Sequence, residues 1–186
     1  MHRGRIIFLN GTSSSGKSTL AKNIQKISKE KFFHVQIDTF CDMLHQKFFD
    51  SDFSETENSV ASLMHKFVVF LSDEGQNVIV DTVIENHHEN WLRECVTLME
   101  FSEVIFVKVS CPPEELEKRE LERGDRTIGQ AIGQYKNMYF NDIYDFEINT
   151  FENTPDECAK IVIDKMKSFK IPDSAFFRLR KKYLNF

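Results

Sequence analysis

Short apolar runs alternate along the chain with longer segments in which apolar residues recur every three or four positions. The runs predict β-strands that are buried on both faces, since only such strands are apolar at nearly every position. They lie at Arg5–Asn10, Phe33–Ile37, Asn77–Asp81, Val104–Val109 and Phe146–Ile148. The longer segments predict amphipathic helices, at residues 17–28, 59–73, 90–101, 113–123, 129–139 and 155–169.

The residues between these elements add local detail. Residues 50–58 are acidic and polar, which predicts a loop before the helix at 59–73. Gly75 and Gly124 lie just after predicted helices, in the position where glycine most often ends a helix. The spacing in the helix at 59–73 predicts a buried face, made of Val60, Leu63, Met64, Phe67 and Leu71.

Strands that alternate with helices predict βαβ units, which build a parallel sheet with helices on both faces. The expected fold class is therefore α/β, with five parallel strands and one domain over residues 1–170. The segment 171–186 is expected to be a basic and aromatic C-terminal extension. It could contact RNA, a membrane or a second subunit, or pack as a short helix on its own domain.

Composition narrows the classes of function. The formal net charge of -5 gives no reason to expect broad nucleic-acid binding, which needs basic patches. The four cysteines form no C-x-x-C pair, which fits a reducing cytoplasm and argues against a zinc ribbon or a disulfide framework. The first apolar run is too short for a signal peptide or a membrane span.

The clearest motif lies between the first strand and the first helix, where residues 11–18 match the phosphate-loop pattern G-x-x-x-x-G-K-[ST]. In this motif, backbone N–H groups and the positive end of the helix bind nucleotide phosphates. The lysine reaches the outer phosphates, and the serine hydroxyl helps to hold Mg²⁺. The predicted nucleotide-binding residues are Gly11, Thr12, Ser13, Ser14, Ser15, Gly16, Lys17, Ser18 and Thr19. The motif predicts a P-loop NTPase fold similar to nucleoside and shikimate kinases, with ATP and Mg²⁺ as cofactors.

Two acids follow predicted strands, at the edge of the sheet where the phosphate loop lies. Asp81 has the position of a Walker B acid, which together with Ser18 would serve Mg²⁺, although an Asp there can also simply cap a turn. Asp38 could accept the proton of an acceptor hydroxyl, or it could cap the helix that begins at Thr39. The apolar residues from Phe40 to Phe53 form either core or a wall of the acceptor site.

Three arginines, Arg119, Arg123 and Arg126, flank Gly124 at helical spacing. Positive groups that close over the phosphates provide much of the catalysis in phosphoryl transfer. We therefore expect a short arginine-bearing lid at about residues 119–134, with Arg119 binding nucleotide and the other two, with Lys17, acting in catalysis. The alternative is a solvated helix face with Glu–Arg pairs, since glutamates lie close by.

A pair of histidines, His87 and His88, has Glu85 and Glu89 beside it, which suggests a metal site. Adjacent side chains on a helix or strand point in different directions, so these residues are poorly placed to bind one ion together. A solvated loop is the preferred interpretation.

Over about residues 5–165, the chain resembles the chloramphenicol phosphotransferase-like family of P-loop kinases. The most particular part of the resemblance is Glu122-Arg-Gly-Asp-Arg126, followed by Gly129, Ala131 and Gln134. The chain departs from the family pattern at Tyr139 and Asn149, where His and Asp are usual.

The resemblance implies a function for several residues. Asp38 would be the catalytic base, Arg123 and Arg126 would bind phosphate, and Asn149 and Thr150 would lie near adenine. The implied reaction moves the γ-phosphate of ATP to a hydroxyl of a small molecule. Two alternatives stay open: a nucleoside or nucleotide kinase, and a nucleotide-binding regulatory module that acts through its C-terminal tail. The sequence also leaves a homo-oligomer open.

Overall fold

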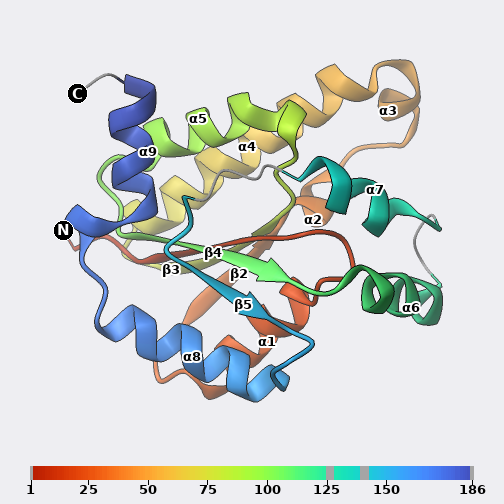
Figure 1. The fold of residues 1–186 in the computed structure, drawn as a ribbon. Helices are drawn as coiled ribbons and strands as arrows, with labels where there is room; N and C mark the ends of the chain where they lie inside the picture. The colour runs from red at the N-terminus through yellow and green to blue at the C-terminus, as the bar shows by residue number, and fades with distance from the viewer. Residues whose placement is uncertain (1, 125–127, 139–142, 185–186) are drawn as a thin grey trace.

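The computed structural model describes residues 2–124, 128–138 and 143–184 (Figure 1). In this part of the chain, five parallel strands form one sheet in the order β2-β3-β1-β4-β5. The strands are β1 (Ile6–Asn10), β2 (Phe32–Gln36), β3 (Asn77–Thr82), β4 (Val104–Ser110) and β5 (Phe146–Asn149). The predicted α/β class and the five-stranded parallel sheet are confirmed.

Helices cover both faces of this sheet (Figure 1). Helices α1 (Lys17–Ile27) and α8 (Pro155–Lys167) pack together on one face. Helices α4 (Phe53–Asp73), α5 (Glu89–Leu98) and α9 (Ala175–Leu184) cover the other. The shorter elements are α2 (Ile37–Cys41), α3 (Lys47–Ser51), η1 (Asn86–His88), α6 (Pro113–Arg123), α7 (Gln130–Asn137) and η2 (Ile171–Asp173).

The central strand β1 shows why the apolar runs predict strands correctly. Ile6 and Phe8 join the core under α4, α5 and α9, whereas Ile7 and Leu9 join the core under α1 and α8. All four side chains are fully buried. Successive side chains of a strand point to opposite faces, so a strand between two helical layers needs an apolar residue at each position.

Two glycines end helices as predicted. Gly75 follows α4 with φ +75°, and Gly124 follows α6 with φ +67°. At the end of α4, Gln76 N donates to Leu71 O and Gly75 N donates to Ser72 O, both at 2.9 Å. These two bonds form a Schellman motif, which satisfies the last carbonyl groups of the helix.

The predicted loop at 50–58 is wrong, because α3 and the first turns of α4 occupy it. The acidic residues start the helix instead of interrupting it. Asp52 is the N-cap of α4, and its side chain accepts a hydrogen bond from Glu55 N at 3.0 Å. Carboxylates are also favourable near the positive end of a helix.

The predicted buried face of α4 is partly wrong. Val60, Met64 and Leu71 are buried as expected, but Leu63 is 58% exposed and Phe67 is 41% exposed. Val68 is fully buried in their place. The apolar residues of α4 extend around more than one side of the helix, so the spacing alone does not decide which side meets the sheet.

The last helix, α9, contributes to the core of the domain. Phe176 is 2% exposed, and its ring lies 5.7 Å from that of Phe8 and 5.5 Å from that of Phe106. Asp145 Oδ1 accepts a hydrogen bond from Ala175 N at 2.7 Å. Residues 175–179, which were expected in an extension, therefore pack against the sheet.

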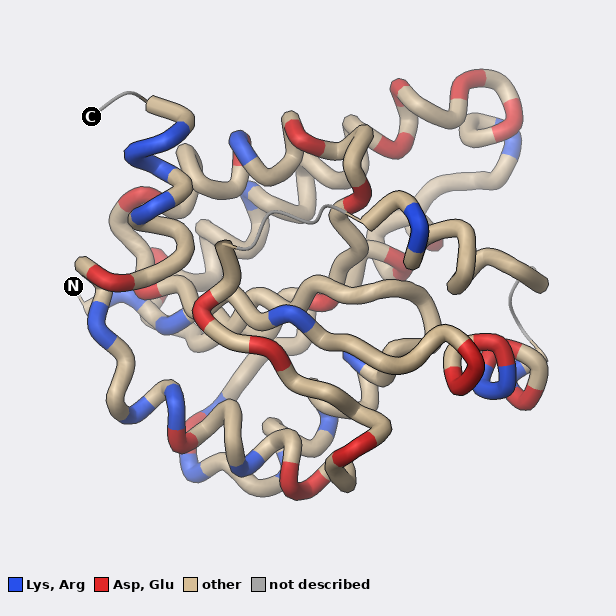
Figure 2. Tube along the Cα trace, viewed as in Figure 1, with Lys and Arg blue, Asp and Glu red and all other residues tan. Residues whose placement is uncertain are grey.

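The charged residues lie mainly on the helices (Figure 2). The charged residues of helix α9 are all basic, namely Arg178, Arg180, Lys181 and Lys182, whereas α6 carries both signs of charge. In the described ranges, each helix is too short or too polar to cross a lipid bilayer.

Candidate active site

The phosphate loop connects β1 to α1 in a conformation that needs glycine at both ends. A Cβ atom at Gly11 would lie 2.3 Å from Val109 O, so a side chain there would collide with the end of β4. Gly16 has φ +91°, which is strained for other residues. The motif glycines therefore fit the loop against β4 and turn it into α1.

The loop presents polar groups that the rest of the described chain does not satisfy. The hydroxyl groups of Ser13, Ser14 and Ser15 are buried and have no hydrogen-bond partner there. Buried polar groups without partners are uncommon in native proteins and call for an explanation. Together with the backbone N–H groups of the loop, the hydroxyls of Ser13 and Ser14 fit the oxygen-rich phosphates of a nucleotide.

Lys17, Ser18 and Asp81 meet at the start of α1. Lys17 Nζ donates to Thr12 O at 2.8 Å and lies 3.8 Å from Asp81 Oδ1. Ser18 Oγ donates to Asp81 Oδ2 at 2.6 Å. Lys17 and Asp81 are 8% and 5% exposed. A hydroxyl oxygen beside a buried carboxylate is a donor set that suits Mg²⁺.

The carboxyl group of Asp81 stays ionised despite its burial. Burial alone would raise its pKa, but the charge of Lys17, the nearby imidazole of His34 and the hydrogen bond from Ser18 outweigh this effect and lower the pKa to about 2. Asp81 is therefore a carboxylate at neutral pH, as a magnesium ligand must be.

Two residues of β2 complete this cluster, and the sequence analysis missed both. Gln36 Nε2 donates to Ser18 Oγ at 3.1 Å and to Asp81 Oδ2 at 3.2 Å. His34 Nε2 lies 3.4 Å from Asp81 Oδ2. Gln36 lies opposite Asp81 in the β2–β3 register. This pairing follows from strand order and register, for which the sequence contains no local signal.

Asp38 lies in the first turn of α2, not directly at the end of a strand as predicted. Strand β2 ends at Gln36, and the chain turns into α2 at Ile37. The side chain of Asp38 is exposed and lines the cavity described below. The short helix thus carries Asp38 to the same side of the sheet as the phosphate loop.

A cavity of about 550 Å³ lies where these elements meet. Most of the predicted site residues line it, namely Ser13, Ser14, Gly16, Lys17, Ser18, Thr19, Asp38, Asp81, Arg119, Arg123 and Thr150. Gly11, Thr12 and Ser15 shape the loop without lining the cavity. Lining residues that the sequence analysis missed include Gln36, Gln130, Gln134, Asn153, Pro155 and Cys158.

Arg119 connects α6 to the end of β5. It donates to Thr150 Oγ1 at 3.0 Å, to Thr150 O at 3.2 Å and to Glu115 Oε1 at 2.9 Å. Thr150 Oγ1 in turn donates to Ser15 O at 2.7 Å. Arg119 therefore links the lid helix to the phosphate loop through Thr150, in addition to lining the cavity.

The other residues predicted for nucleotide binding or catalysis have different surroundings. The side chain of Asn149 accepts a hydrogen bond from Phe151 N at 2.9 Å, within its own turn, and is not part of the cavity lining. Arg123 is exposed at the end of α6 and lines the cavity. Arg126 and Tyr139 lie outside the described residues.

Helix α7 approaches the phosphate loop through contacts that the sequence analysis did not predict. Gln134 Oε1 accepts a hydrogen bond from Ser13 N at 2.6 Å. Glu120 is only 3% exposed, in contrast to the alternative of a solvated Glu–Arg face, and accepts from Gly129 N at 2.6 Å and from Ala131 N at 2.7 Å. The predicted lid segment is thus attached to both α6 and the loop.

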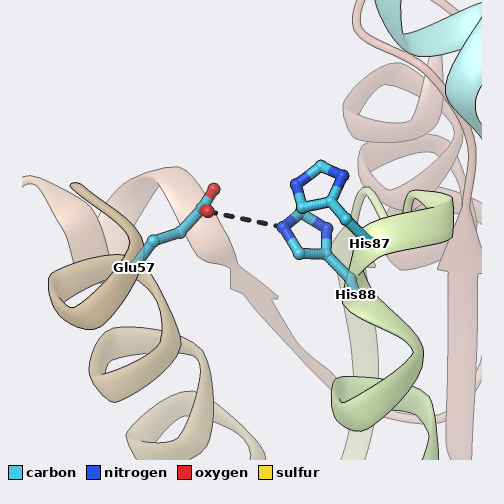
Figure 3. Close-up of side chains that lie close together, drawn as sticks. All are labelled: Glu57, His87 and His88. Atoms are coloured by element: carbon cyan, nitrogen blue, oxygen red, sulfur yellow. Dashed lines mark hydrogen bonds and ion pairs between the residues drawn. The ribbon is translucent and has the colours of Figure 1, made fainter.

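A cluster outside this cavity contains Glu57 of α4 with His87 and His88 of η1 (Figure 3). One ligand atom from each lies within 4.8 Å of the others. The expected solvated loop is wrong for His88, which is 6% exposed and stacks on Trp91 with ring centroids 3.8 Å apart.

The hydrogen bonds of His88 indicate a structural role for this cluster. His88 Nδ1 accepts from Glu85 N at 3.3 Å, so the ring proton lies on Nε2. Nε2 faces Glu57 Oε2 at 3.4 Å, where it donates (Figure 3). A metal ion would need the lone pair of this nitrogen, and the geometry instead links η1 to α4.

Comparison with known proteins gives a consistent result. A family model described as "Chloramphenicol phosphotransferase-like protein" matches residues 4–167. Two Mycobacterium tuberculosis proteins, from strains CDC 1551 / Oshkosh and ATCC 25618 / H37Rv, are named "Putative O-phosphotransferase". Each is 31% identical over 209 residues, which covers 100% of this chain and 92% of the relative.

Solved kinases share the fold. The APS kinase of Mycobacterium tuberculosis, in complex with AMPPNP and APS, matches with a TM-score of 0.67 at 17% identity, over 90% of this chain and 99% of its own. The shikimate kinase of Acinetobacter baumannii, in complex with shikimate, matches with a TM-score of 0.65 at 12% identity, over 91% and 97%. At these identities the likeness establishes the P-loop kinase fold alone.

Proposed function

The chain belongs to the chloramphenicol phosphotransferase-like family, and we propose that it moves the γ-phosphate of ATP to a hydroxyl group of a small molecule. One observation carries the proposal. The phosphate loop, the Lys17–Ser18–Asp81 cluster and Asp38 all face one cavity. A phosphotransferase needs these groups together, because the phosphate donor, its metal ion and the acceptor must meet in one place.

The loop and Lys17 would hold the phosphates of ATP. Backbone N–H groups at the start of α1 face the phosphates, and the ammonium group of Lys17 balances the charge that develops during transfer. Ser18 and Asp81 would hold Mg²⁺, which neutralises phosphate charge when it is bound. The unsatisfied hydroxyls of Ser13 and Ser14, which line the cavity, support this assignment.

Asp38 is proposed as the base for the acceptor hydroxyl. It lines the same cavity and is carried by a short helix beyond the end of β2. An exposed carboxylate at this place can take the proton that the hydroxyl loses when its oxygen attacks the γ-phosphate. Arg123 lines the cavity from α6 and would add positive charge near the transferred group.

We also propose that the protein works in a reducing cytoplasm. All four cysteines are free thiols, and three of them, Cys95, Cys111 and Cys158, are buried. Burial raises the pKa of each of these three thiols, which keeps them protonated and unreactive.

The test is a screen for γ-phosphate transfer from labelled ATP to hydroxylated metabolites, nucleosides and antibiotics. An Asp38→Asn variant serves as the blank, and Asp42→Asn, an exposed acid just after α2, is its matched control. Asp38→Asn should lose about 100-fold or more of the transfer rate, because it cannot accept the proton. Both variants should bind MgATP as the wild type does.

The outcomes separate the alternatives. Transfer to a nucleoside or nucleotide alone would assign the protein to the nucleoside and nucleotide kinases. MgATP binding without transfer to any acceptor would favour a nucleotide-binding regulatory module. Transfer that survives in Asp38→Asn would remove Asp38 from the base role while leaving the phosphotransferase assignment in place.

A further inference from the structure

Gln134 is the side chain through which α7 reaches the phosphate loop. Its Oε1 accepts the hydrogen bond from Ser13 N at 2.6 Å, and the residue lines the cavity. This bond fixes the orientation of the amide group, because the oxygen takes the N–H and the Nε2 group must lie on the other side. Nε2 has two hydrogens to donate, and within the described residues it donates to none.

Glu120 determines where α7 begins. Its two carboxylate oxygens each accept a backbone N–H at the start of α7, from the N-cap residue Gly129 at 2.6 Å and from Ala131 at 2.7 Å. Glu120 is buried on α6, and Ala131 packs in a small apolar cluster with Cys111 and Leu116. A carboxylate at a helix N-terminus is stabilised by the partial positive charge there. The start of α7, four residues before Gln134, is therefore held on α6.

We propose that Gln134 donates a hydrogen bond from Nε2 to the γ-phosphate of the bound nucleotide, and that Glu120 is the positioning residue that holds α7 for this contact. The inference rests on the proposed function, since it takes the phosphate loop to bind ATP. The loop and the start of α1 bind the inner phosphates. Gln134 comes from α7 rather than from the loop, so its donor would reach the phosphate that the loop leaves exposed, which is the γ-phosphate.

Two probes test this contact without a known acceptor: MgADP alone, and MgADP with beryllium fluoride, which takes the place of the γ-phosphate. Their affinities are measured by titration calorimetry on the full chain. Gln134→Ala should bind MgADP within about twofold of the wild type, and it should lose about tenfold in affinity for the fluoride complex, because one hydrogen bond to a charged group is removed. Asn137→Ala, which removes an exposed amide from the same helix, should change neither affinity.

Two further variants separate donation by Gln134 from simple packing. Gln134→Glu keeps the size of the side chain and an acceptor for Ser13 N–H, but it loses the donor, so its affinity for the fluoride complex should fall at least as far as in Gln134→Ala. In Glu120→Gln the side chain has only one carbonyl oxygen, so it can accept well from only one of the backbone N–H groups of Gly129 and Ala131. This variant should therefore weaken the fluoride complex in the same way. The double variant Glu120→Gln/Gln134→Ala should be no weaker than Gln134→Ala, because Glu120 acts through Gln134.

Each contrary result has a distinct meaning. A wild type that binds neither probe would overturn the proposed function itself. If the wild type binds both probes and Gln134→Ala and Gln134→Glu bind them equally well, Gln134 does not contact the γ-phosphate. Tighter binding of MgADP to Gln134→Ala would also overturn the inference, because it would mean that Gln134 competes with a phosphate for Ser13 N–H. Additive losses in the double variant would overturn the role of Glu120.

Discussion

At the residue scale, close contacts decide which side chains the phosphate loop accepts. Gly11 lies against the end of β4, where an added Cβ would meet Val109 O at 2.3 Å and Ser15 Oγ at 2.8 Å. The first of these atoms belongs to the backbone of a central strand, which cannot move without disturbing the sheet. The glycine of the motif is therefore required by packing as well as by phosphate binding.

Substitution of Gly11 tests this contact. Gly11→Ala should displace the loop and reduce MgADP affinity by roughly tenfold or more, with a loss of about 1–3 kcal/mol in the free energy of unfolding from overpacking. Titration calorimetry and urea denaturation measure the two effects. Gly133→Ala is the control, since an added Cβ at Gly133 meets no atom within 4 Å. Equal behaviour of the two variants would contradict the packing argument.

Glu94 of α5 forms a polar link to α4. Its Oε2 lies 2.7 Å from Nδ1 of the fully buried His65, and Ser62 Oγ donates to Oε1 at 2.7 Å. The hydrogen bond from His65 is the largest influence on Glu94, and it outweighs burial and lowers the pKa of the carboxyl group below its usual 4.5. The charged form of Glu94 therefore stabilises the folded state.

This shift predicts a dependence of stability on pH. A carboxyl group with a lowered pKa contributes stability above its ordinary pKa of 4.5, and the contribution is lost as the pH falls through the lower value of the folded state. Glu94→Gln should cost roughly 2 kcal/mol at pH 7. Its free energy of unfolding should also fall less steeply than that of the wild type below pH 5. Urea denaturation between pH 7 and pH 3 measures both, and parallel curves would exclude this role of Glu94.

At the scale of single elements, the start of α4 shows how capping competes with composition. The acidic stretch at 50–58 is typical of a loop, yet Asp52 caps the helix through its bond to Glu55 N. The helix then runs from Phe53 to Asp73, with a core stripe that includes Val60, Met64 and Val68. The N-cap bond of Asp52 thus helps a polar segment to start a helix.

Removal of this cap should have a measurable cost. Asp52→Ala should lower the free energy of unfolding by about 1 kcal/mol, because an N–H group of the first turn loses its acceptor. Asp50→Ala is the matched control on α3, and we expect a change of less than about 0.5 kcal/mol. Equilibrium urea denaturation distinguishes the two. A similar loss in both variants would point to net charge rather than capping.

At the scale of the whole molecule, α9 completes the core. The rings of Phe8, Phe106 and Phe176 lie within 5.7 Å of one another and are all buried. These residues come from β1, β4 and the last helix of the chain. The C-terminal segment thus shares the core of the sheet, so its removal would affect folding before it affected any partner.

Two neighbouring phenylalanines test this view. Phe176→Ala should destabilise the protein by about 3–5 kcal/mol, the usual cost of a buried aromatic ring. Phe177→Ala should cost less than about 1 kcal/mol, because Phe177 is only partly buried and lies beside Lys181. Thermal and urea denaturation measure both. Deletion of residues 171–186 should behave like Phe176→Ala or worse, and a truncated chain of wild-type stability would contradict the core role of α9.

The sequence by itself determined the features that depend on neighbouring residues. Apolar runs such as Arg5–Asn10 predict buried strands because burial on both faces constrains each position in turn. The phosphate loop is contiguous, so Gly11 to Ser18 could be recognised from spacing alone. Asp38 and Arg123 line the cavity as expected, but their roles in the reaction stay predictions, as does that of Arg126.

The tertiary structure decided which distant side chains meet. Gln36 contacts Asp81 because β2 lies beside β3, and Gln134 contacts Ser13 because α7 lies over the loop, 121 residues away in the chain. The burial of Glu120 and the place of Phe176 in the core follow from helix packing in the same way. A sequence pattern reflects whether each position in a short segment is buried or exposed. These contacts instead depend on strand order, register and helix placement, which bring together segments that are far apart in the chain.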